Sequence, residues 1–330
     1  NNTSQIEPIL NNITTVSNME YCFYKTTIDS TEILNRINMK NGTSLAYCFG
    51  YCKNITELND VSISSKVSSV EGMFEGSNIA RVNNFTVLCS MIDNLFKNCK
   101  KLLVVNNFSA TATTSYKSLF EGCSSLVEIP LKDIPTYITD ISYMYKDCTN
   151  LQSANGMVFG ENLVSYEGIF EGCENLIQAN NMVVKGNYYN TIFRNWKGVR
   201  YINNLLISFV GRSMNFSNMF EGCSDLMEFS FHNDSYVKEV ISMDYMFKGT
   251  NISRIDITNV NLEKLISAKY LFTESNMTSI TFKLPTTISS IQGLLSNCPN
   301  LEEIHDVAFE KHLSNCTDWI TGSPIKVLRN

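Results

Sequence analysis

A short segment centred on an aromatic residue recurs along this chain, and its recurrence constrains the fold more than any other feature. The clearest copies run from Leu119 to Leu126, from Ile169 to Leu176 and from Met219 to Leu226. Looser copies give about twelve repeats at a mean spacing of about 25 residues. A fixed period of this length is typical of solenoids, in which each repeat packs only against its neighbours. The central residues, called anchors below, are Phe23, Phe49, Phe74, Phe96, Phe120, Tyr145, Phe170, Phe193, Phe220, Phe247, Phe272 and Leu295.

Each repeat also carries a segment in which apolar and polar residues alternate, such as Leu126 to Leu131. Alternation of this kind predicts a short β-strand. The segment 138–141 is a second candidate strand, and we expect the turn around each anchor to be helical or 3₁₀. The sequence therefore predicts an α/β repeat solenoid with a parallel β ladder. The anchor rings should stack in its core, each contributing about 1.5–3 kcal/mol of burial.

The repeats run without a break, so one solenoid accounts for most of the 330 residues. We assign residues 1–18 to a partial N-terminal repeat and 19–309 to the solenoid. The pattern fails after Phe309, which predicts a C-terminal cap over 310–330. The first residues already match the inside of a repeat, with no initiator Met and no leader. We therefore expect a processed chain or a piece of a longer one.

Eleven cysteines would indicate disulfides in a small secreted domain, but most of them follow the repeat. Seven lie three residues after an anchor, in a slot that Ser or Thr fills in other repeats. Since Ser and Thr cannot form disulfides, we predict that the slot holds buried thiols outside any disulfide. The cysteines therefore do not fix the redox compartment. This prediction covers Cys52, Cys99, Cys123, Cys148, Cys173 and Cys223.

A second ladder is polar and consists of paired Asn or Asp residues at one position of the repeat. Examples are Asn83-Asn84 and Asn106-Asn107. Asn and Asp tolerate a left-handed backbone and form local hydrogen bonds. Two interpretations are open: a bulge or turn whose amides satisfy backbone groups, and an exposed polar stripe that binds a ligand or a cation.

Several function classes are disfavoured by composition and by missing motifs. A net charge of −6 argues against a nucleic-acid partner, and no apolar run reaches the ~18 residues of a membrane span. No nucleophile elbow, P-loop or H-E-x-x-H motif occurs. We predict no enzymatic activity, no cofactor and no metal. The only conceivable zinc set has spacings that match no common site, and it comprises Cys298, His305, His312 and Cys316. A row of acidic residues in one slot indicates a solvated face, at Glu75, Glu121, Glu171 and Glu221.

One repeat breaks the pattern and supplies the candidate binding site. Trp196 stands where other repeats have Cys, and a side chain this large should not fit an unaltered core slot. It must displace the loop or point outward. Trp, Tyr and Arg are enriched in interface hot spots. The alternative is a local irregularity in which Trp196 packs against its neighbours. The candidate ligand-binding residues are Trp196, Arg200, Tyr201, Ile177, Met227, Tyr188 and Tyr189.

These repeats resemble a known family. The pattern Phe-x-x-Cys-x-x-Leu-x-x-Ile resembles the BspA-like, or Treponema pallidum-type, leucine-rich repeat. The forms Met-Phe-x-Gly-Cys and Met-Phe-x-Gly-Thr are similar to a repeat of mycoplasma-type surface lipoproteins. The resemblance covers about residues 10 to 310, and departs from the family in the Asn-Asn pairs and in Trp196. It implies a leucine-rich-repeat-like solenoid. Members are mostly exported or cell-surface proteins that adhere to host proteins or cells.

We therefore expect an extracellular recognition scaffold, or adhesin, that binds a protein or a glycan through the solenoid surface. The expected location is the cell surface or the extracellular space, with a virion surface as an alternative. One further interpretation is a structural or receptor-binding part of a virion or appendage fibre. Another is an intracellular protein-interaction solenoid.

Overall fold

The computed structural model describes residues 15–36, 39–186, 189–208, 213–233, 237, 239–257, 260–281, 284–285, 287–305 and 318–329. The chain divides into two compact units. The first comprises residues 1–131 and 137–151, and the second comprises 132–136 and 152–330. Together they contain about 11 turns of a parallel β-solenoid. The proposed boundaries at residues 19 and 309 stay predictions, because residues 1–14 and 306–317 lie outside the described ranges.

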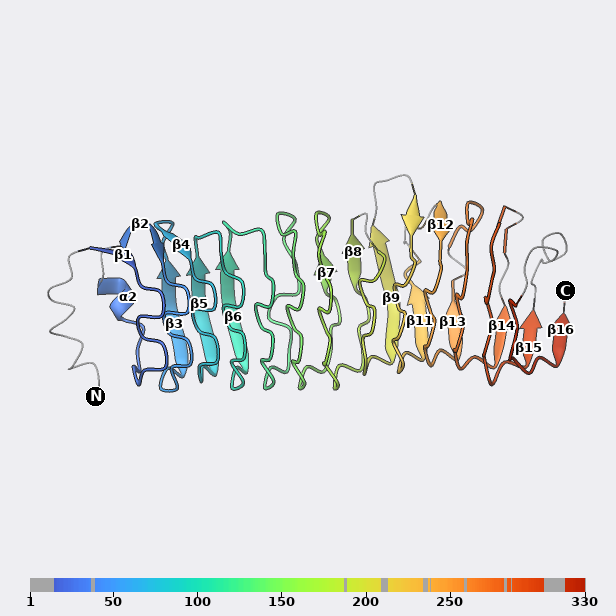
Figure 1. Cartoon of the computed structure of the whole chain (residues 1–330), viewed down its shortest axis with the longest axis horizontal. Coiled ribbons are helices and arrows are strands. Elements are labelled where there is room, and N and C mark those ends of the chain that lie inside the picture. Colours follow the sequence, from blue (N-terminus) through green and yellow to red (C-terminus); the bar gives the residue numbers. More distant parts are fainter. Residues whose placement is uncertain are drawn as a thin grey trace. The chain divides into compact units, whose positions relative to one another are not determined.

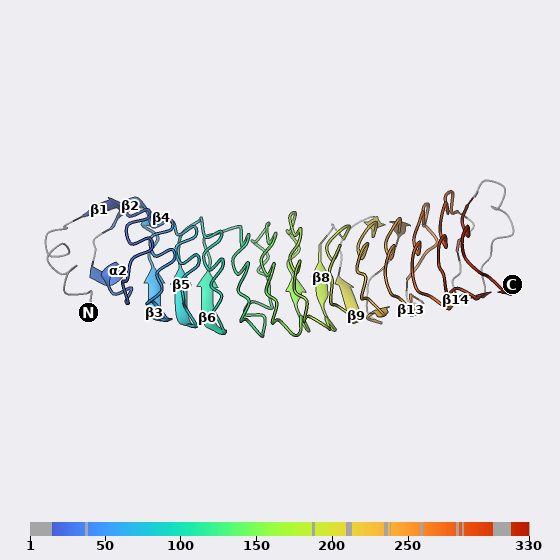
Figure 2. The same cartoon turned by 60° about the horizontal axis from the view of Figure 1, so that its bottom comes forward.

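Within the described residues of the first unit, six strands form two parallel sheets. One sheet has the order β1-β2-β4 and the other β3-β5-β6, and the strands of each lie side by side (Figures 1 and 2). The register is strict in the second sheet, where Leu58 pairs with Val82 and Val82 with Val105. The strands are β1 (Val16–Asn18), β2 (Met39–Ser44), β3 (Glu57–Ile63), β4 (Val67–Ser69), β5 (Arg81–Val87) and β6 (Val104–Ala110).

The part of the second unit that the structure describes has three parallel sheets, with the orders β13-β11-β9-β8-β7, β10-β12 and β14-β15-β16. Every strand pair among the described residues is parallel, so the predicted parallel ladder is confirmed. The strands are β7 (Val158–Phe159), β8 (Val183–Lys185), β9 (Tyr201–Ser208), β10 (Met214–Asn215), β11 (Glu228–Phe231), β12 (Val240–Ser242), β13 (Arg254–Asp256), β14 (Ser279–Thr281), β15 (Glu303–His305) and β16 (Val327–Arg329).

The expected helical component is almost absent. Within the described residues, α2 (Ile33–Arg36) is the only helix, so the α/β description was wrong in its α part. The turn around the anchor is neither helical nor 3₁₀. It consists of overlapping β-turns, as in the bonds from Glu121 N–H to the Ser118 carbonyl (3.2 Å) and from Cys123 N–H to the Phe120 carbonyl (3.1 Å). Ser118 (φ 53°) and Gly122 (φ 73°) are left-handed, and such residues interrupt a helix.

These turns stack on one another through backbone hydrogen bonds. Phe120 N–H donates to the Met144 carbonyl at 3.0 Å, and Gly122 N–H donates to the Lys146 carbonyl at 2.7 Å. A Ser, Asn or Asp five residues before the anchor starts the turn; Ser115 Oγ, for example, accepts from Lys117 N–H at 3.2 Å. The turns therefore form a continuous ladder that sequence patterning did not reveal.

The anchors form the core, as predicted. Within the first unit Phe96 stacks on Phe120 at 5.7 Å between ring centroids, and Phe120 stacks on Tyr145 at the same distance. Within the second unit Phe220 stacks on Phe247 at 5.4 Å. All five rings are buried. Face-to-face contact between successive repeats therefore stabilises each unit along its length.

The six predicted slot cysteines are buried, and none forms a disulfide. Their thiols are small enough for this position, and they also form hydrogen bonds there. Cys123 Sγ donates a hydrogen bond to the Phe96 carbonyl of the preceding repeat at 3.1 Å. In the shorter turn, Ser77 Oγ donates to the carbonyl of its own anchor, Phe74, at 2.7 Å. Thiol and hydroxyl replace one another because either can satisfy a buried anchor carbonyl.

The paired Asn and Asp residues lie on the solvent side of the strands. The second residue of each pair is left-handed, as at Asn84 (φ 52°) and Asn107 (φ 54°), so both side chains of a pair face outward. In the first unit the amides bond to one another: Asn83 Nδ2 donates to Asn59 Oδ1 at 2.8 Å, and Asn106 Nδ2 donates to Asn83 Oδ1 at 2.9 Å. The expected left-handed backbone is confirmed, and the amides form a ladder rather than capping the backbone there.

Candidate functional site

Trp196 points into the core of the second unit, as in the alternative interpretation that it packs against its neighbours, and the outward orientation is excluded. Its side chain is 2% exposed. The indole stacks on Phe170 at 4.5 Å between centroids with the planes 19° apart, and it contacts Phe193 at 5.7 Å. Its buried Nε1 atom has no hydrogen-bond partner among the described residues. The ring that follows Phe170 in this stack is thus Trp196 instead of the next anchor.

The inserted indole coincides with a break in the turn ladder. At the position of Gly172, other repeats form a bond to the next turn, as from Gly222 N–H to the Lys248 carbonyl at 2.9 Å. The equivalent bond from Gly172 to Arg194 is missing from the described part of the second unit, and so is the bond from Gly168 to Asn190. Inserting a large ring between two anchors separates the turns that carry them.

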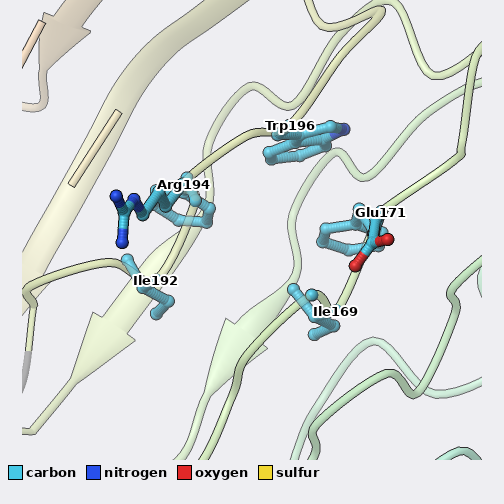
Figure 3. A pocket seen from close by; sticks show the side chains of 8 residues that line it. Ile169, Glu171, Ile192, Arg194 and Trp196 are labelled. Carbon is cyan, nitrogen blue, oxygen red and sulfur yellow. The ribbon is translucent and has the colours of Figure 1, made fainter. Parts of the chain in front are cut away.

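A small pocket lies at this break (Figure 3). Its volume is about 10 Å³, enough for one water molecule, and it is partly open to solvent. Ile169 and Ile192 are buried and form apolar walls, whereas Glu171 and Arg194 are exposed and carry opposite charges. Arg194 forms an ion pair with Glu221 at 2.9 Å. The pocket is lined by Gly168, Ile169, Phe170, Glu171, Ile192, Phe193, Arg194 and Trp196.

Tyr189, one of the candidate tyrosines, does not contribute to an exposed patch. Tyr189 is buried, and its ring makes an edge-to-face contact with Phe216 at 5.3 Å. Burial raises the pKa of its phenol far above the usual range, as expected for a core residue. Tyr188 lies outside the described residues. Trp196 and Tyr189 therefore shape this region from within and offer little side-chain surface to a partner.

The remaining four candidates lie on adjacent rungs at the start of the strands. Arg200 N–H donates to the Ile177 carbonyl at 2.7 Å, and Met227 N–H donates to the Arg200 carbonyl at 2.9 Å. Ile177, Arg200 and Met227 thus form one column with side chains about 4.8 Å apart. Tyr201 opens β9 next to this column and pairs with Glu228. We call these four residues the strand-edge column.

The strand-edge column combines apolar, cationic and aromatic side chains. Ile177 is 44% exposed and Arg200 is exposed, whereas Tyr201 and Met227 are half-buried. Tyr, Met and Arg are enriched at protein interfaces, and half-buried rings lose little conformational freedom on binding. Sequence reasoning identified these residues because the strand register could be counted from the anchors.

The sequence-based interpretation of the charged residues directly after the anchors was wrong. Glu121 and Glu221 were interpreted as part of a solvated acidic face. Basic residues occupy the same slot of the repeats between them, so charges alternate from rung to rung: Lys97 pairs with Glu121 at 3.0 Å, and Arg194 pairs with Glu221 at 2.9 Å. Aligning every repeat at the residue after the anchor would have revealed Lys97, Lys146, Arg194 and Lys248 in this row.

The geometry defines a class of protein: a repeat solenoid with parallel strands and stacked tight turns. Within the described residues, the helical content is too short and too polar for any membrane crossing. A family model matches residues 1–103, 72–199 and 213–317, and its description is the BspA type leucine rich repeat region. The chain belongs to this family of repeat proteins, as the sequence resemblance indicated.

Two solved structures are similar to this chain. A leucine-rich repeat protein from Bacteroides ovatus has 14% sequence identity and a TM-score of 0.45, and the match covers 97% of this chain and 75% of that one. A leucine-rich repeat protein from Eubacterium ventriosum has 15% identity and a TM-score of 0.37, and the match covers 95% of this chain and 77% of that one. No curated protein matches the sequence significantly.

Proposed function

We propose that this chain is a non-enzymatic recognition scaffold that binds a protein partner through the strand-edge column. The observation that carries the proposal is the convergence of Ile177, Arg200, Tyr201 and Met227 on adjacent rungs of the second unit. Parallel strands hold these side chains at fixed spacing, which lowers the ordering cost of binding. Family membership supports a repeat-based interaction scaffold.

We further propose an extracellular or cell-surface location and a role in adhesion. The support is the family: proteins with repeats of this type are often surface-associated. A protein partner is favoured over a glycan because the column exposes an isoleucine and a methionine beside Arg200. Aliphatic side chains of this kind suit the apolar centre of a protein interface.

The test measures binding to a panel of immobilised extracellular-matrix proteins and of glycans. Arg200→Ala and Tyr201→Ala should each weaken binding by roughly 30-fold, which corresponds to about 2 kcal/mol for a hot-spot residue. Arg81→Ala is the matched control, since Arg81 is an exposed arginine at the start of β5 in the first unit. If both column variants stay folded and bind like the parent, the column is not the site.

A further inference from the structure

The ladder of turns in the second unit is interrupted at one pair of neighbouring turns. In the described part of this unit, neither the Gly168 nor the Gly172 N–H has an acceptor, and the Arg194 carbonyl has no donor. The interruption does not extend to the following turn, because Asn195 N–H donates to the Glu221 carbonyl at 2.8 Å. At these positions the two turns are therefore not joined by backbone hydrogen bonds.

The strand side of the same two repeats is continuous. Ala179 N–H donates to the Tyr201 carbonyl at 2.9 Å, and β8 pairs with β9 in parallel register. The repeats also meet closely at Gly198, where a Cβ atom would lie 2.7 Å from the Glu174 carbonyl oxygen. A rotation about the strand side therefore separates the two turns without loss of backbone hydrogen bonds at the interrupted positions.

Side-chain packing holds the turn side of the break together. The Trp196 indole lies on the Phe170 ring at 4.5 Å between centroids, and Ile169 and Ile192 are buried beside the pocket (Figure 3). This closed arrangement leaves the buried Trp196 Nε1 atom without a partner among the described residues, which is unfavourable. Opening would hydrate Nε1 and the two glycine N–H groups, and this hydration offsets part of the lost stacking.

We propose that the second unit contains a hinge between residues 168–172 and 190–194. The turn side opens at this hinge while β8 and β9 stay paired, and stacking of Trp196 on Phe170 closes it again. Hinges of this kind place the change in backbone angles in a few residues at the ends of elements. The hinge is independent of the proposed binding function, and its tests use the protein without any partner.

The first experiment follows hydrogen exchange of the Trp196 indole N–H by NMR in Trp319→Phe, where Trp196 is the single tryptophan. After correction for intrinsic rates, it should exchange at least about tenfold faster than the Gly222 amide, which donates to the Lys248 carbonyl at 2.9 Å. Its rate should change little with urea below the unfolding transition, since a local opening exposes little surface. Exchange of the indole N–H with the rate and urea dependence of the Gly222 amide would overturn the proposal.

The second experiment closes the hinge with a covalent staple. Glu171 and Arg194 are exposed and lie directly after the anchors of the two turns. In Glu171→Cys with Arg194→Cys, a short bis-maleimide joins the two thiols across the break. The background carries Cys22→Ser, because Cys22 is an exposed native thiol. The staple should slow exchange of the Trp196 indole N–H at least about tenfold, and an unchanged rate would overturn the proposal.

A matched control places the same staple between two bonded turns of the second unit. Asn276 and Asn300 are exposed, and their amides are joined by a hydrogen bond of 2.6 Å. Stapling Asn276→Cys to Asn300→Cys should leave exchange of the Trp196 indole N–H unchanged, and equal slowing by both staples would overturn the proposal. If the staple across the break prevents folding, Trp196→Cys replaces it. The Gly172 amide should then exchange at least about tenfold more slowly than in the parent, and equal exchange would overturn the proposal.

Discussion

At the scale of single residues, the position three residues after each anchor accepts Cys, Ser or Thr because each side chain is small and can donate a hydrogen bond. Cys99 Sγ donates to the Phe74 carbonyl at 3.1 Å and also lies 3.5 Å from Ser77 Oγ. A small side chain with one weak donor is therefore required, and both Cys and Ser meet this requirement. Trp196 is the exception: its single donor is buried with no acceptor in the described residues, which leaves the cost of desolvation uncompensated.

Burial of the slot thiols predicts a pH-dependent stability. Desolvation raises the pKa of Cys99 and of Cys223 from 9.0 to about 12, because the thiolate cannot be hydrated in the core. A raised pKa in the folded state means that the folded protein holds the proton more tightly than the unfolded chain. This contribution is fully present below pH 9 and is lost as pH rises towards 12. We expect the free energy of unfolding to fall by about 1.4 kcal/mol per thiol for each pH unit in that window.

Denaturant unfolding at pH 7 to 11 would measure this loss. Cys99→Ser is the control, because a hydroxyl does not titrate in this range and the variant should lose correspondingly less stability. Tyrosine ionisation affects the parent and the variant alike. An identical pH dependence in the two proteins would contradict the prediction.

At the scale of elements, two ladders run along the strands and turns of the first unit. The left-handed residue in each Asn pair turns a second amide outward, and the amides then bond from rung to rung. Asn84 Nδ2 donates to Asp60 Oδ1 at 2.8 Å, parallel to the ladder through Asn83. Parallel strands in register permit this arrangement, since identical positions lie about 4.8 Å apart.

An amide in the middle of a ladder should contribute more to the free energy of unfolding than an amide at its end. Asn83→Ala removes two hydrogen bonds, to Asn59 and from Asn106, whereas Asn59→Ala removes only the first. With a net value of about 0.5–1.5 kcal/mol per bond, we expect Asn83→Ala to cost about 1–3 kcal/mol and Asn59→Ala about half as much. Thermal or urea unfolding of both variants measures the difference. Equal costs would mean that the ladder adds no stability at these exposed positions.

At the scale of the whole molecule, each unit is a row of neighbouring repeats. Its stability is approximately a sum of repeat terms and interface terms between adjacent repeats. Phe120 contributes to two interfaces, with Phe96 and with Tyr145, each at 5.7 Å. Damage at one anchor should therefore remain local.

Phe120→Ala tests this local character. The loss of a buried ring should cost about 3–5 kcal/mol. Hydrogen exchange should accelerate most in the repeats of Phe96, Phe120 and Tyr145, and least near Phe49. Phe247→Ala is the counterpart in the second unit, where the affected repeats should be those of Phe220 and Phe272. Uniform acceleration across the first unit in Phe120→Ala would show cooperative unfolding of that unit instead.

Much of the fold followed from counting along the chain. The anchor period placed the stacked rings and the parallel register, and Ser at the Cys slot predicted thiols outside disulfides. The alignment of Ile177, Arg200 and Met227 in the strand-edge column could also be predicted from the sequence, because residues at equal distance from their anchors occupy equal positions on successive rungs. These features depend on periodicity, which is a property of the sequence itself.

The conformation of the turns and the break in the turn ladder beside Trp196 could be determined only from the tertiary structure. Sequence periodicity does not distinguish a 3₁₀ turn from overlapping β-turns with left-handed residues such as Ser118 (φ 53°). For Trp196 the sequence showed that the side chain is too large for its slot, but not where it goes. The Trp196 ring lies in the core, where it stacks on Phe170 and is buried. The backbone hydrogen bond from Gly172 N–H to the Arg194 carbonyl is absent from the described residues. That outcome depends on contacts between turns, and the free energy of such contacts is set only when neighbouring repeats are packed together.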